Sequence, residues 1–416
     1  MNKQLDKQLR LAKQASLEVA KLSAKRKEAL LLAMAKNLVK HKEKIFEANA
    51  IDIANTKAKR ATGTFIDRLT LTEKGFAGMI SQLNIVAHLQ DVTGEVIEER
   101  TLANGIHLQK MRFPLGVIAM IYESRPNVTT DAAGLCLKSG NAVILKGGSE
   151  AAYTNRVLVR YIHEVLEKFH ITKEVVTFLD NATHEVVNEM LKRNDLIDVV
   201  IPRGSYALTT AVAEKSRIPI LYHSSGGARM YVDKSADLEQ ALEICVNAKT
   251  NRTCVCNALD MVLVHKDIAR TFLTQLDVRL AGKGFEVRSD RSSKQYMPHA
   301  QLANEKDFST EFLDSILAVK VISSSEEAIA FIKTHTHAHT EILAAKDKKV
   351  IDAFIQEVDV AGLMINCSSR LHDGGEFEMG AEMGTATGKL HARGPVGIRE
   401  LTTYKWIAYG NGQVKQ

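Results

Sequence analysis

The sequence contains few cysteines and no long apolar segment. Five cysteines among 416 residues are too sparse, and odd in number, for a disulfide framework, which favours a reducing cytoplasmic setting. No apolar run approaches the roughly 18 residues of a membrane span. The N-terminal segment is charged and helix-forming, unlike a secretory signal. We therefore expect a cytoplasmic protein without a membrane anchor.

Neither sign of charge is collected into a tract. The chain has 55 Lys and Arg against 49 Asp and Glu, a net charge of +6 that is spread along its length. This spread argues against a nucleic-acid surface, and a mild positive excess suits anionic small molecules. With 45% hydrophobic and 25% charged residues the chain is typical of a globular protein, and its length predicts two or more domains.

Apart from a helical N-terminal segment, the chain alternates short apolar runs with helical segments. Alternation of this kind predicts a parallel, doubly wound α/β sheet whose ligands bind at the carboxyl ends of the strands. The expected strands are 116–122, 142–146, 175–179, 198–201 and 218–222, then 261–264, 319–323, 341–345 and 363–367.

A different pattern occupies residues 96–114. Two extended runs flank Ala103-Asn104-Gly105, and an Asn-Gly pair between extended runs is the strongest short signal for a β-hairpin. Residues 402–409 form a strand-like tail. A charged hairpin with exposed edges tends to pair with another strand.

Polar turns follow several expected strands, at residues 123–127, 147–149 and 202–205. Gly-Ser at the start of a helix offers backbone N–H groups and the positive end of the helix dipole to a phosphate. There is no G-x-G-x-x-G fingerprint, and each turn alone is more often a plain turn than a cofactor contact. Their occurrence at successive strand ends is stronger evidence for an anionic cofactor.

The chemistry centres on residues 251–264, NRTCVCNALDMVLV. A thiolate of Cys254 or Cys256 would attack a carbonyl carbon, whereas Cys-x-Cys is poor spacing for zinc. The structural alternative is a pair of small buried hydrophobes at the start of a strand. Alternating histidines in THTHAHT share one face, but nothing else indicates a metal, and we expect none.

The order of these segments resembles the aldehyde dehydrogenase superfamily. The Arg-Pro-Asn turn at 125–127, SGNAVILK at 139–146, IPRGS at 201–205 and TCVCNALDMVLV are similar to its Asn-bearing turn, cofactor segment, phosphate turn and nucleophile segment. Within the superfamily, YESRPNVT, CNALDMVLVH, DGGEFEMGAE and KLHARGPVG resemble the γ-glutamyl phosphate reductase family.

This resemblance implies two doubly wound parallel-sheet domains and a β-hairpin oligomerisation unit. The expected boundaries are 1–95 and 114–229 for the NADP-binding domain, 230–390 for the catalytic domain, and 96–113 with 391–416 for the hairpin and tail. It further implies a homodimer or a dimer of dimers, and it leaves open a transient contact with a glutamate 5-kinase.

The activity implied is NADPH-dependent reduction of γ-glutamyl phosphate to glutamate 5-semialdehyde through a cysteine thioester, the second step of proline synthesis. Another acyl-phosphate- or CoA-dependent aldehyde dehydrogenase is the alternative. The resemblance selects Cys256 as the nucleophile over Cys254 and Asn127 for the oxyanion. His223 stands where oxidising relatives use a glutamate to activate water, which is consistent with phosphate as the acyl partner.

The resemblance also implies the residues that hold cofactor and substrate. Ser149 stands where many relatives have a basic residue near the cofactor. The cofactor candidates are Lys146 for the adenosine ribose or 2′-phosphate, Gly204 and Ser205 for the pyrophosphate, and Asp314 for the nicotinamide ribose. The substrate candidates are Arg393 first and Arg370 second, with Asn366 and Ser369 nearby, and Arg125 or Arg252 for the phosphate.

Overall fold

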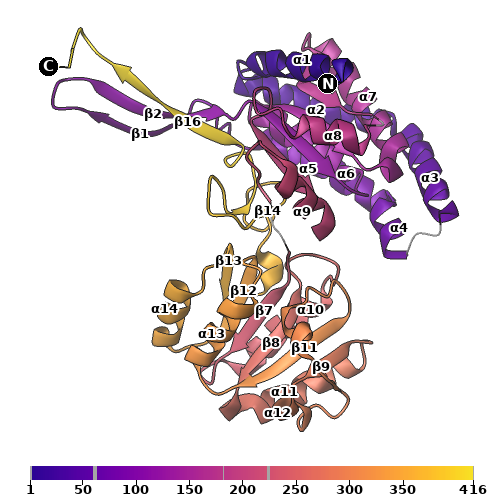
Figure 1. Ribbon diagram of the computed structural model, residues 1–416, viewed down its shortest axis with the longest axis vertical. Coiled ribbons are helices and arrows are strands. Elements are labelled where there is room, and N and C mark those ends of the chain that lie inside the picture. The colour runs from indigo at the N-terminus through magenta and orange to yellow at the C-terminus, as the bar shows by residue number, and fades with distance from the viewer. Residues whose placement is uncertain (1, 60–62, 181, 223–224, 416) are drawn as a thin grey trace. The chain divides into compact units, whose positions relative to one another are not determined.

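A computed structural model describes residues 2–59, 63–180, 182–222 and 225–415 (Figure 1). The chain forms two compact units: residues 1–222, 378–384 and 396–416 make the first, and residues 223–377 and 385–395 make the second. The predicted boundary at 229/230 lies within the second sheet, because Ala228 and Arg229 already pair with the strands beside them.

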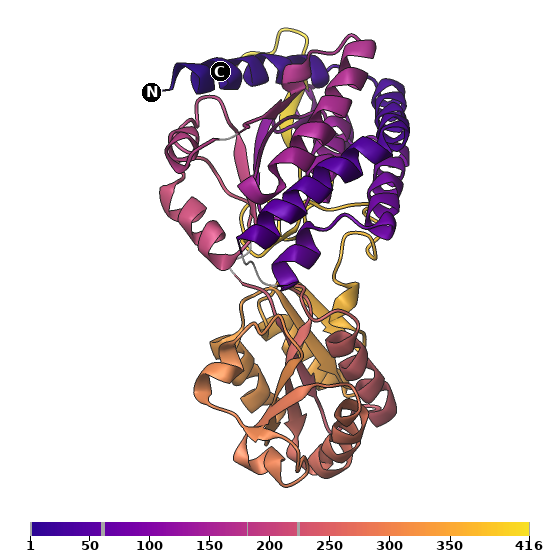
Figure 2. The ribbon, with the colours of Figure 1, turned by 90° about the vertical axis from the view of Figure 1, so that its right-hand side faces the viewer.

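Amphipathic helices open the first unit. Side-chain oxygens of Asn2, Ser23 and Thr72 accept hydrogen bonds from the backbone N–H groups that begin α1, α2 and α5. Leu5 and Leu9 of α1 are buried in the same core as the first parallel sheet. Figure 2 shows these helices in indigo. Their bounds are α1 Lys3–Val19, α2 Ala24–Lys40, α3 Lys42–Ala58, α4 Gly63–Leu69 and α5 Glu73–His88.

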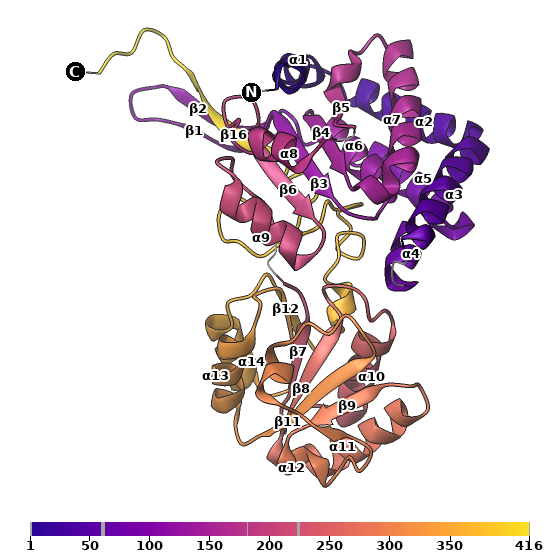
Figure 3. The same ribbon diagram turned by 45° about the vertical axis from the view of Figure 1, so that its right-hand side comes forward.

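The sheet of the first unit is parallel, in the order β5-β4-β3-β6, with helices between successive strands (Figure 3). Every residue of the central strand β3 is buried, as its continuous apolar run predicts. The strands are β3 Val117–Tyr122, β4 Ala142–Gly147, β5 Val176–Phe178 and β6 Val199–Arg203, and the helices are α6 Asn127–Lys138, η1 Ser149–Ala151, α7 Ala152–Lys168, η2 Lys173–Val175, α8 His184–Met190 and α9 Tyr206–Lys215.

The strand predicted at 218–222 does not form. Only an isolated bridge joins Ile220 to Val200, through Val200 N to Pro219 O at 2.9 Å and Leu221 N to Val200 O at 3.0 Å. Proline has no N–H to donate, so the ladder cannot continue through Pro219.

The second unit is built on a parallel sheet in the order β10-β9-β11-β8-β7-β12-β13. Two clusters of buried apolar side chains pack against it. The strands are β7 Ala228–Val232, β8 Leu259–His265, β9 Glu286–Ser289, β10 Gln301–Leu302, β11 Ile316–Ile322, β12 Thr340–Ala344 and β13 Gly362–Ile365. The helices are α10 Leu238–Thr250, α11 Lys266–Ala281, α12 Arg291–Lys294, η3 Glu305–Ser309, α13 Ser325–His335, α14 Lys348–Glu357 and η4 Ser369–Leu371, and β14 Thr385–Ala386 pairs with β15 Gly394–Pro395.

An antiparallel arm completes the first unit. Strands β1 Val96–Thr101 and β2 His107–Pro114 form the predicted hairpin, and β16 Thr402–Tyr409 pairs along the full length of β2 (Figure 1). Gly105 adopts φ 83° in the turn, a conformation that glycine tolerates without strain. Every residue of β1 is exposed. In the described part of the chain, no helix is long and apolar enough to cross a membrane.

Candidate active site

The Cys256 loop of the second unit lies between α10 and β8. Gly227 N donates a hydrogen bond of 2.6 Å to Cys256 O, and a Cβ atom added to Gly226 would lie only 2.5 Å from Cys256 Cβ. A glycine is therefore required at position 226 for this close approach, and Gly227 is favoured by its φ of 88° and by Asp260 Oδ2, which would lie 2.5 Å from an added Cβ. The packing fixes the backbone of the predicted nucleophile.

The cysteines fall into buried and half-buried groups. Cys136 and Cys245 are fully buried in the cores, and burial raises the pKa of both thiols, that of Cys245 to about 12. Burial also raises the pKa of Cys367. Cys254 and Cys256 are half-buried. The structure thus does not place the Cys-x-Cys pair in the apolar core, which was the alternative to a reactive cysteine.

The short helix η4 is held against the residue that follows the nucleophile. Arg370 Nη1 donates to Asn257 Oδ1, and Arg370 Nε donates to Asn251 Oδ1 at 3.2 Å. Ser369 Oγ donates to Asn257 O at 2.6 Å. Two predicted substrate residues, Arg370 and Ser369, therefore lie beside the Cys256 loop, although they are more than one hundred residues away in sequence.

Arg370 carries its charge in a partly desolvated position. Burial lowers the pKa of its guanidinium, and the nearby positive charge of Arg252 lowers it further. The negative charges of Asp373 and Glu376 act in the opposite direction. Arg252 itself is exposed. Two arginines, Arg370 and Arg252, therefore lie in this region together with the carboxylates of Asp373 and Glu376.

The other predicted substrate residues of this unit have partners within the protein. Arg393 Nη1 donates to Asp359 Oδ1 at 2.5 Å and Arg393 Nη2 to Asp359 O at 3.1 Å. Lys389 also pairs with Asp359. The amide of Asn366 bonds both the N–H and the carbonyl oxygen of Ala345. These contacts hold Arg393 and Asn366 in place, and their contact with substrate stays a prediction.

A carboxylate that the sequence did not reveal lies beside the nucleophile loop. Glu311 Oε2 accepts a hydrogen bond of 2.8 Å from Ser225 Oγ, and a Cβ on Gly227 would lie 3.6 Å from Glu311 Cα. Asp314, the predicted cofactor contact, is exposed and accepts from Ser315 N, the adjacent backbone group. No local spacing could reveal Glu311, because Ser225 lies 86 positions away.

In the first unit, carboxylates join the turns at the carboxyl end of the sheet. Glu123 Oε2, after β3, accepts from Ser205 N at 2.7 Å, and Ser205 also caps α9. Glu150 Oε1, after β4, accepts from Ser124 N at 2.7 Å, which holds Ser124 at φ 46°. The N–H predicted to bind pyrophosphate is therefore satisfied by Glu123, which a phosphate would have to displace.

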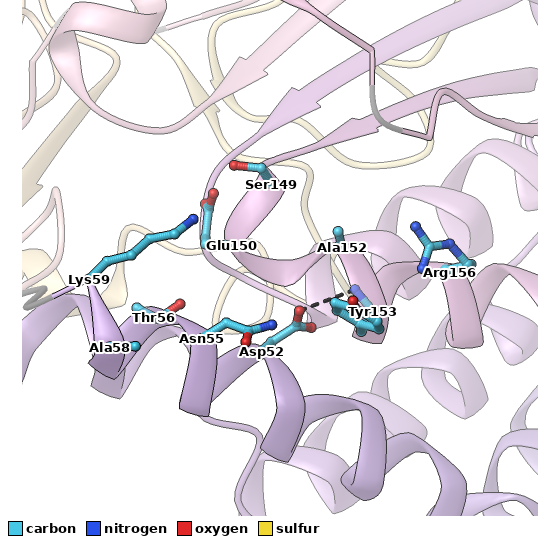
Figure 4. A pocket seen from close by; sticks show the side chains of 10 residues that line it. All are labelled: Asp52, Asn55, Thr56, Ala58, Lys59, Ser149, Glu150, Ala152, Tyr153 and Arg156. Atoms are coloured by element: carbon cyan, nitrogen blue, oxygen red, sulfur yellow. Dashed lines mark hydrogen bonds between the residues drawn. The ribbon is translucent and has the colours of Figure 1, made fainter.

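The turn after β4 contains the other cofactor candidates. Lys146 Nζ donates to Gly147 O at 2.7 Å, and burial lowers its pKa while Glu150 opposes that shift. A cavity of about 520 Å³ opens next to this turn, between α3 and the start of α7 (Figure 4). Ser149, Glu150, Lys59, Tyr153 and Arg156 are among its lining residues.

Asn127, the predicted oxyanion ligand, is the first residue of α6 and is exposed. Its Nδ2 donates to Asp131 Oδ2 at 2.8 Å, one helical turn later. Burial raises the pKa of Asp131 to about 7, against the effects of Asn127 and Arg203. Arg125 is half-buried in the preceding turn. Asn127 and Cys256 belong to different units, and each is positioned by its own unit.

The histidines of the THTHAHT segment make separate contacts with neighbouring groups. The rings of His335 and His337 bond backbone carbonyl oxygens, and His339 Nδ1 lies 2.7 Å from Thr340 Oγ1. Within the described residues, no group of three or more His, Cys, Asp or Glu side chains is arranged to hold a metal. His223, predicted at the position of the water-activating glutamate, lies outside the described residues.

Both units are similar to known enzymes. The model of the aldehyde dehydrogenase family matches residues 1–298. γ-Glutamyl phosphate reductase of Thermodesulfovibrio yellowstonii is 43% identical over 405 residues, 97% of each chain. That of Dehalococcoides mccartyi is 41% identical over 417 residues, 99% of this chain and 98% of the other.

Solved structures agree over the same span. The crystal structure of γ-glutamyl phosphate reductase from Thermotoga maritima has a TM-score of 0.96 at 37% identity and covers 99% of this chain and 100% of its own. An acetylating aldehyde dehydrogenase from Geobacillus thermoglucosidasius has a TM-score of 0.71 at 18% identity, covering 99% of this chain and 98% of its own. The latter shares the fold alone.

The raised pKa of Asp131 predicts a pH dependence of stability. Between its usual value of 3.8 and about 7, the folded protein holds a proton that the unfolded chain has released. The free energy of unfolding therefore falls as pH rises through this window, by roughly 1.4 kcal/mol per pH unit at most. Asp131→Asn should lower the slope by this amount in urea unfolding between pH 5 and 7, whereas Glu341 and Asp260, whose pKa values burial raises to about 7 and about 6, keep their contributions. Equal slopes in both proteins would contradict the assignment.

Proposed function

Because the chain belongs to the γ-glutamyl phosphate reductase family of the aldehyde dehydrogenases, we propose that it reduces γ-glutamyl phosphate to glutamate 5-semialdehyde. The proposal makes it an NADP-dependent oxidoreductase of cytoplasmic proline synthesis. The observation that carries it is the Cys256 loop, with the nucleophile half-buried, backed by two glycines and flanked by Arg370.

The first step is attack by the Cys256 thiolate on the acyl carbon of γ-glutamyl phosphate. A C–S bond forms, the bond from the acyl carbon to the phosphate oxygen breaks, and inorganic phosphate leaves with the electron pair. The Cys256 backbone N–H would stabilise the oxyanion, and the Asn127 amide is the second donor that the family resemblance implies; donors of this kind contribute roughly 3 kcal/mol each. The Asp131 carboxylate fixes one N–H of that amide.

NADPH, when bound, supplies a hydride to the acyl carbon of the thioester. The resulting thiohemiacetal collapses, releasing the aldehyde and returning the cysteine. A thioester suits this step because it accepts hydride more readily than an ester or a free acid does. The residues of this chain position the acyl group and hold the negative charge on its oxygen.

The residues at the carboxyl end of the first sheet fit a dinucleotide. Lys146 would contact the adenosine ribose or its 2′-phosphate, and the neighbouring cavity of about 520 Å³ lies within the usual range of small-molecule sites. Gly204 and Ser205 would bind the pyrophosphate after the hydrogen bond from Ser205 N to Glu123 is broken. For the nicotinamide ribose, the contact with Ser225 favours Glu311 over Asp314.

Arg370 is the better supported of the two substrate arginines. A guanidinium binds phosphate or carboxylate in a two-pronged way, and Arg370 lies beside the Cys256 loop. Arg393 is paired with Asp359, so an arriving anion would have to compete with that carboxylate. Ser369 then acts mainly by holding the Cys256 loop, and Asn366 by bonding the backbone of Ala345 after β12. Arg252, and Arg125 at the turn before α6, remain candidates for the phosphate.

Substitution of the cysteines tests the proposal. Cys256→Ser should lower phosphate-dependent NADP reduction with pyrroline-5-carboxylate, the form to which glutamate 5-semialdehyde cyclises spontaneously, by at least about 10³-fold, because an alcohol is a far weaker nucleophile than a thiolate near neutral pH. Cys254→Ala is the matched control and should keep near wild-type activity. A Cys256→Ser enzyme with substantial activity would overturn the thioester mechanism.

Substitution of Arg393 tests its place in the substrate site. If Arg393 binds the substrate, Arg393→Ala should raise the KM for glutamate 5-semialdehyde by about 10-fold or more while the KM for NADP stays unchanged. Steady-state kinetics with each substrate varied in turn provide the measurement. An unchanged KM for the semialdehyde would show that Arg393 does not bind the substrate and that its role is the ion pair with Asp359.

The antiparallel arm is the proposed oligomerisation unit of a homodimer or a dimer of dimers. Trp406, the chain's only tryptophan, is 47% exposed on β16, beside exposed Tyr404. Burial against a second copy would stabilise an apolar surface of this kind. Trp406→Glu should give a smaller species in analytical ultracentrifugation, with Leu390→Glu, at an exposed position off the arm, as control. An unchanged mass for Trp406→Glu would contradict this role.

A further inference from the structure

The side chain of Asn257 has two polar ends, and each has one defined partner. Its Oδ1 accepts from Arg370 Nη1, and its Nδ2 donates to His372 O at 3.0 Å. Its backbone oxygen accepts from Ser369 Oγ at 2.6 Å. Asn257 is buried and directly follows Cys256. The residue after the nucleophile therefore makes three separate hydrogen bonds to the segment 369–372.

The partners of Arg370 differ in kind from those of Arg393. Arg370 donates to amide oxygens, those of Asn251 and Asn257. In the part of the chain that the structure describes, Arg370 has no carboxylate partner within ion-pair distance, whereas Arg393 is paired with Asp359. Amide oxygens orient a guanidinium without neutralising it. Arg370 is thus held in place with its positive charge available to an anion.

We propose that Asn257 is a positioning residue: it fixes the Arg370 guanidinium beside Cys256 so that the guanidinium receives the phosphate of the acyl phosphate substrate. This inference rests on the proposed function, since the anion is the phosphate that leaves when Cys256 is acylated. Asn257 acts through Arg370 and does not itself touch the substrate.

Asparagine suits this role for a chemical reason. The position needs an acceptor for Arg370 and a donor for His372 O on one short planar side chain, and an amide supplies both. Aspartate would keep the acceptor but lose the donor, and its charge would neutralise Arg370. Alanine would lose both and leave buried polar groups without partners. Asn257→Asp therefore keeps an acceptor that can hold the Arg370 guanidinium in place, but it neutralises the positive charge of that guanidinium.

The test measures how inorganic phosphate protects Cys256 from alkylation by iodoacetamide, in a Cys254→Ala background, so that a single thiol of the loop reacts. Arg370→Ala and Asn257→Ala should each raise the half-protecting phosphate concentration about 10- to 100-fold, as expected for loss of a hydrogen bond to a charged group. The double variant should be no weaker than Arg370→Ala alone, because Asn257 acts only through Arg370.

Asn257→Asp gives a second readout. It should weaken phosphate protection as strongly as Asn257→Ala does, even where it folds as well as wild type, because a carboxylate neutralises the guanidinium. Asn37→Ala is the control, since Asn37 is a buried amide of the first unit that donates to Tyr161 O at 2.9 Å. It should lower stability and leave phosphate protection unchanged.

Three results would overturn the inference: independent, multiplying effects of the Arg370 and Asn257 substitutions, wild-type phosphate protection in Asn257→Asp, or no protection by phosphate in the parent protein. Reductase activity is measured separately on the wild-type enzyme. The wild-type enzyme could reduce γ-glutamyl phosphate while the effects of the Arg370 and Asn257 substitutions multiply. In that case the proposed function stands, and Asn257 has no positioning role in it.

Discussion

The hydrogen bonds between Asn257 and the segment 369–372 are the constraint on which the candidate active site depends. They join two loops of the second unit that lie 112 or more positions apart in sequence. On the opposite side, the Gly226–Gly227 turn packs directly against Cys256. The nucleophile loop is thus held on one side by the backbone of the glycine turn and on the other by the side chains of Asn257 and Ser369.

In the first unit, the turns at the carboxyl end of the sheet are held by charged side chains. Glu123 and Glu150 extend from successive strand ends and accept hydrogen bonds from the backbone N–H groups of neighbouring turns. Such contacts keep the turns in shape when no anion is present, and a bound phosphate would compete for the same N–H of Ser205. In the proposed mechanism, cofactor binding therefore includes the displacement of a carboxylate.

The sequence predicts those features that depend on neighbouring residues. Continuous apolar runs locate β3 and β4, and Asn104-Gly105 locates the hairpin, because these signals are local. The strand expected at 218–222 fails because Pro219 cannot donate to the ladder. Strand β7 was not predicted, because Arg229 interrupts its apolar run. Arg229 is a buried cation whose partner, Glu341, lies 112 positions away in sequence.

The residues of the candidate site also fall into those that local segments reveal and those that depend on long-range contacts. Cys256 and Asn127 come from segments that resemble a family, whereas the roles of Glu311 and Asn257 depend on contacts between distant loops. Sequence reasoning likewise ranked Arg393 above Arg370, since the HARGPVG segment is distinctive and the pairing with Asp359 cannot be seen in it. Long-range hydrogen bonds decide such rankings, and one sequence alone does not contain them.

In the proposed mechanism, Cys256 carries the acyl group. The most direct measurement is peptide mass spectrometry after mixing the enzyme with NADP and glutamate 5-semialdehyde in the absence of phosphate, quenched within one turnover. We expect one γ-glutamyl group on the peptide containing Cys256, together with one equivalent of NADPH formed. Formation of NADPH with an unmodified Cys256 peptide at every quench time would contradict it.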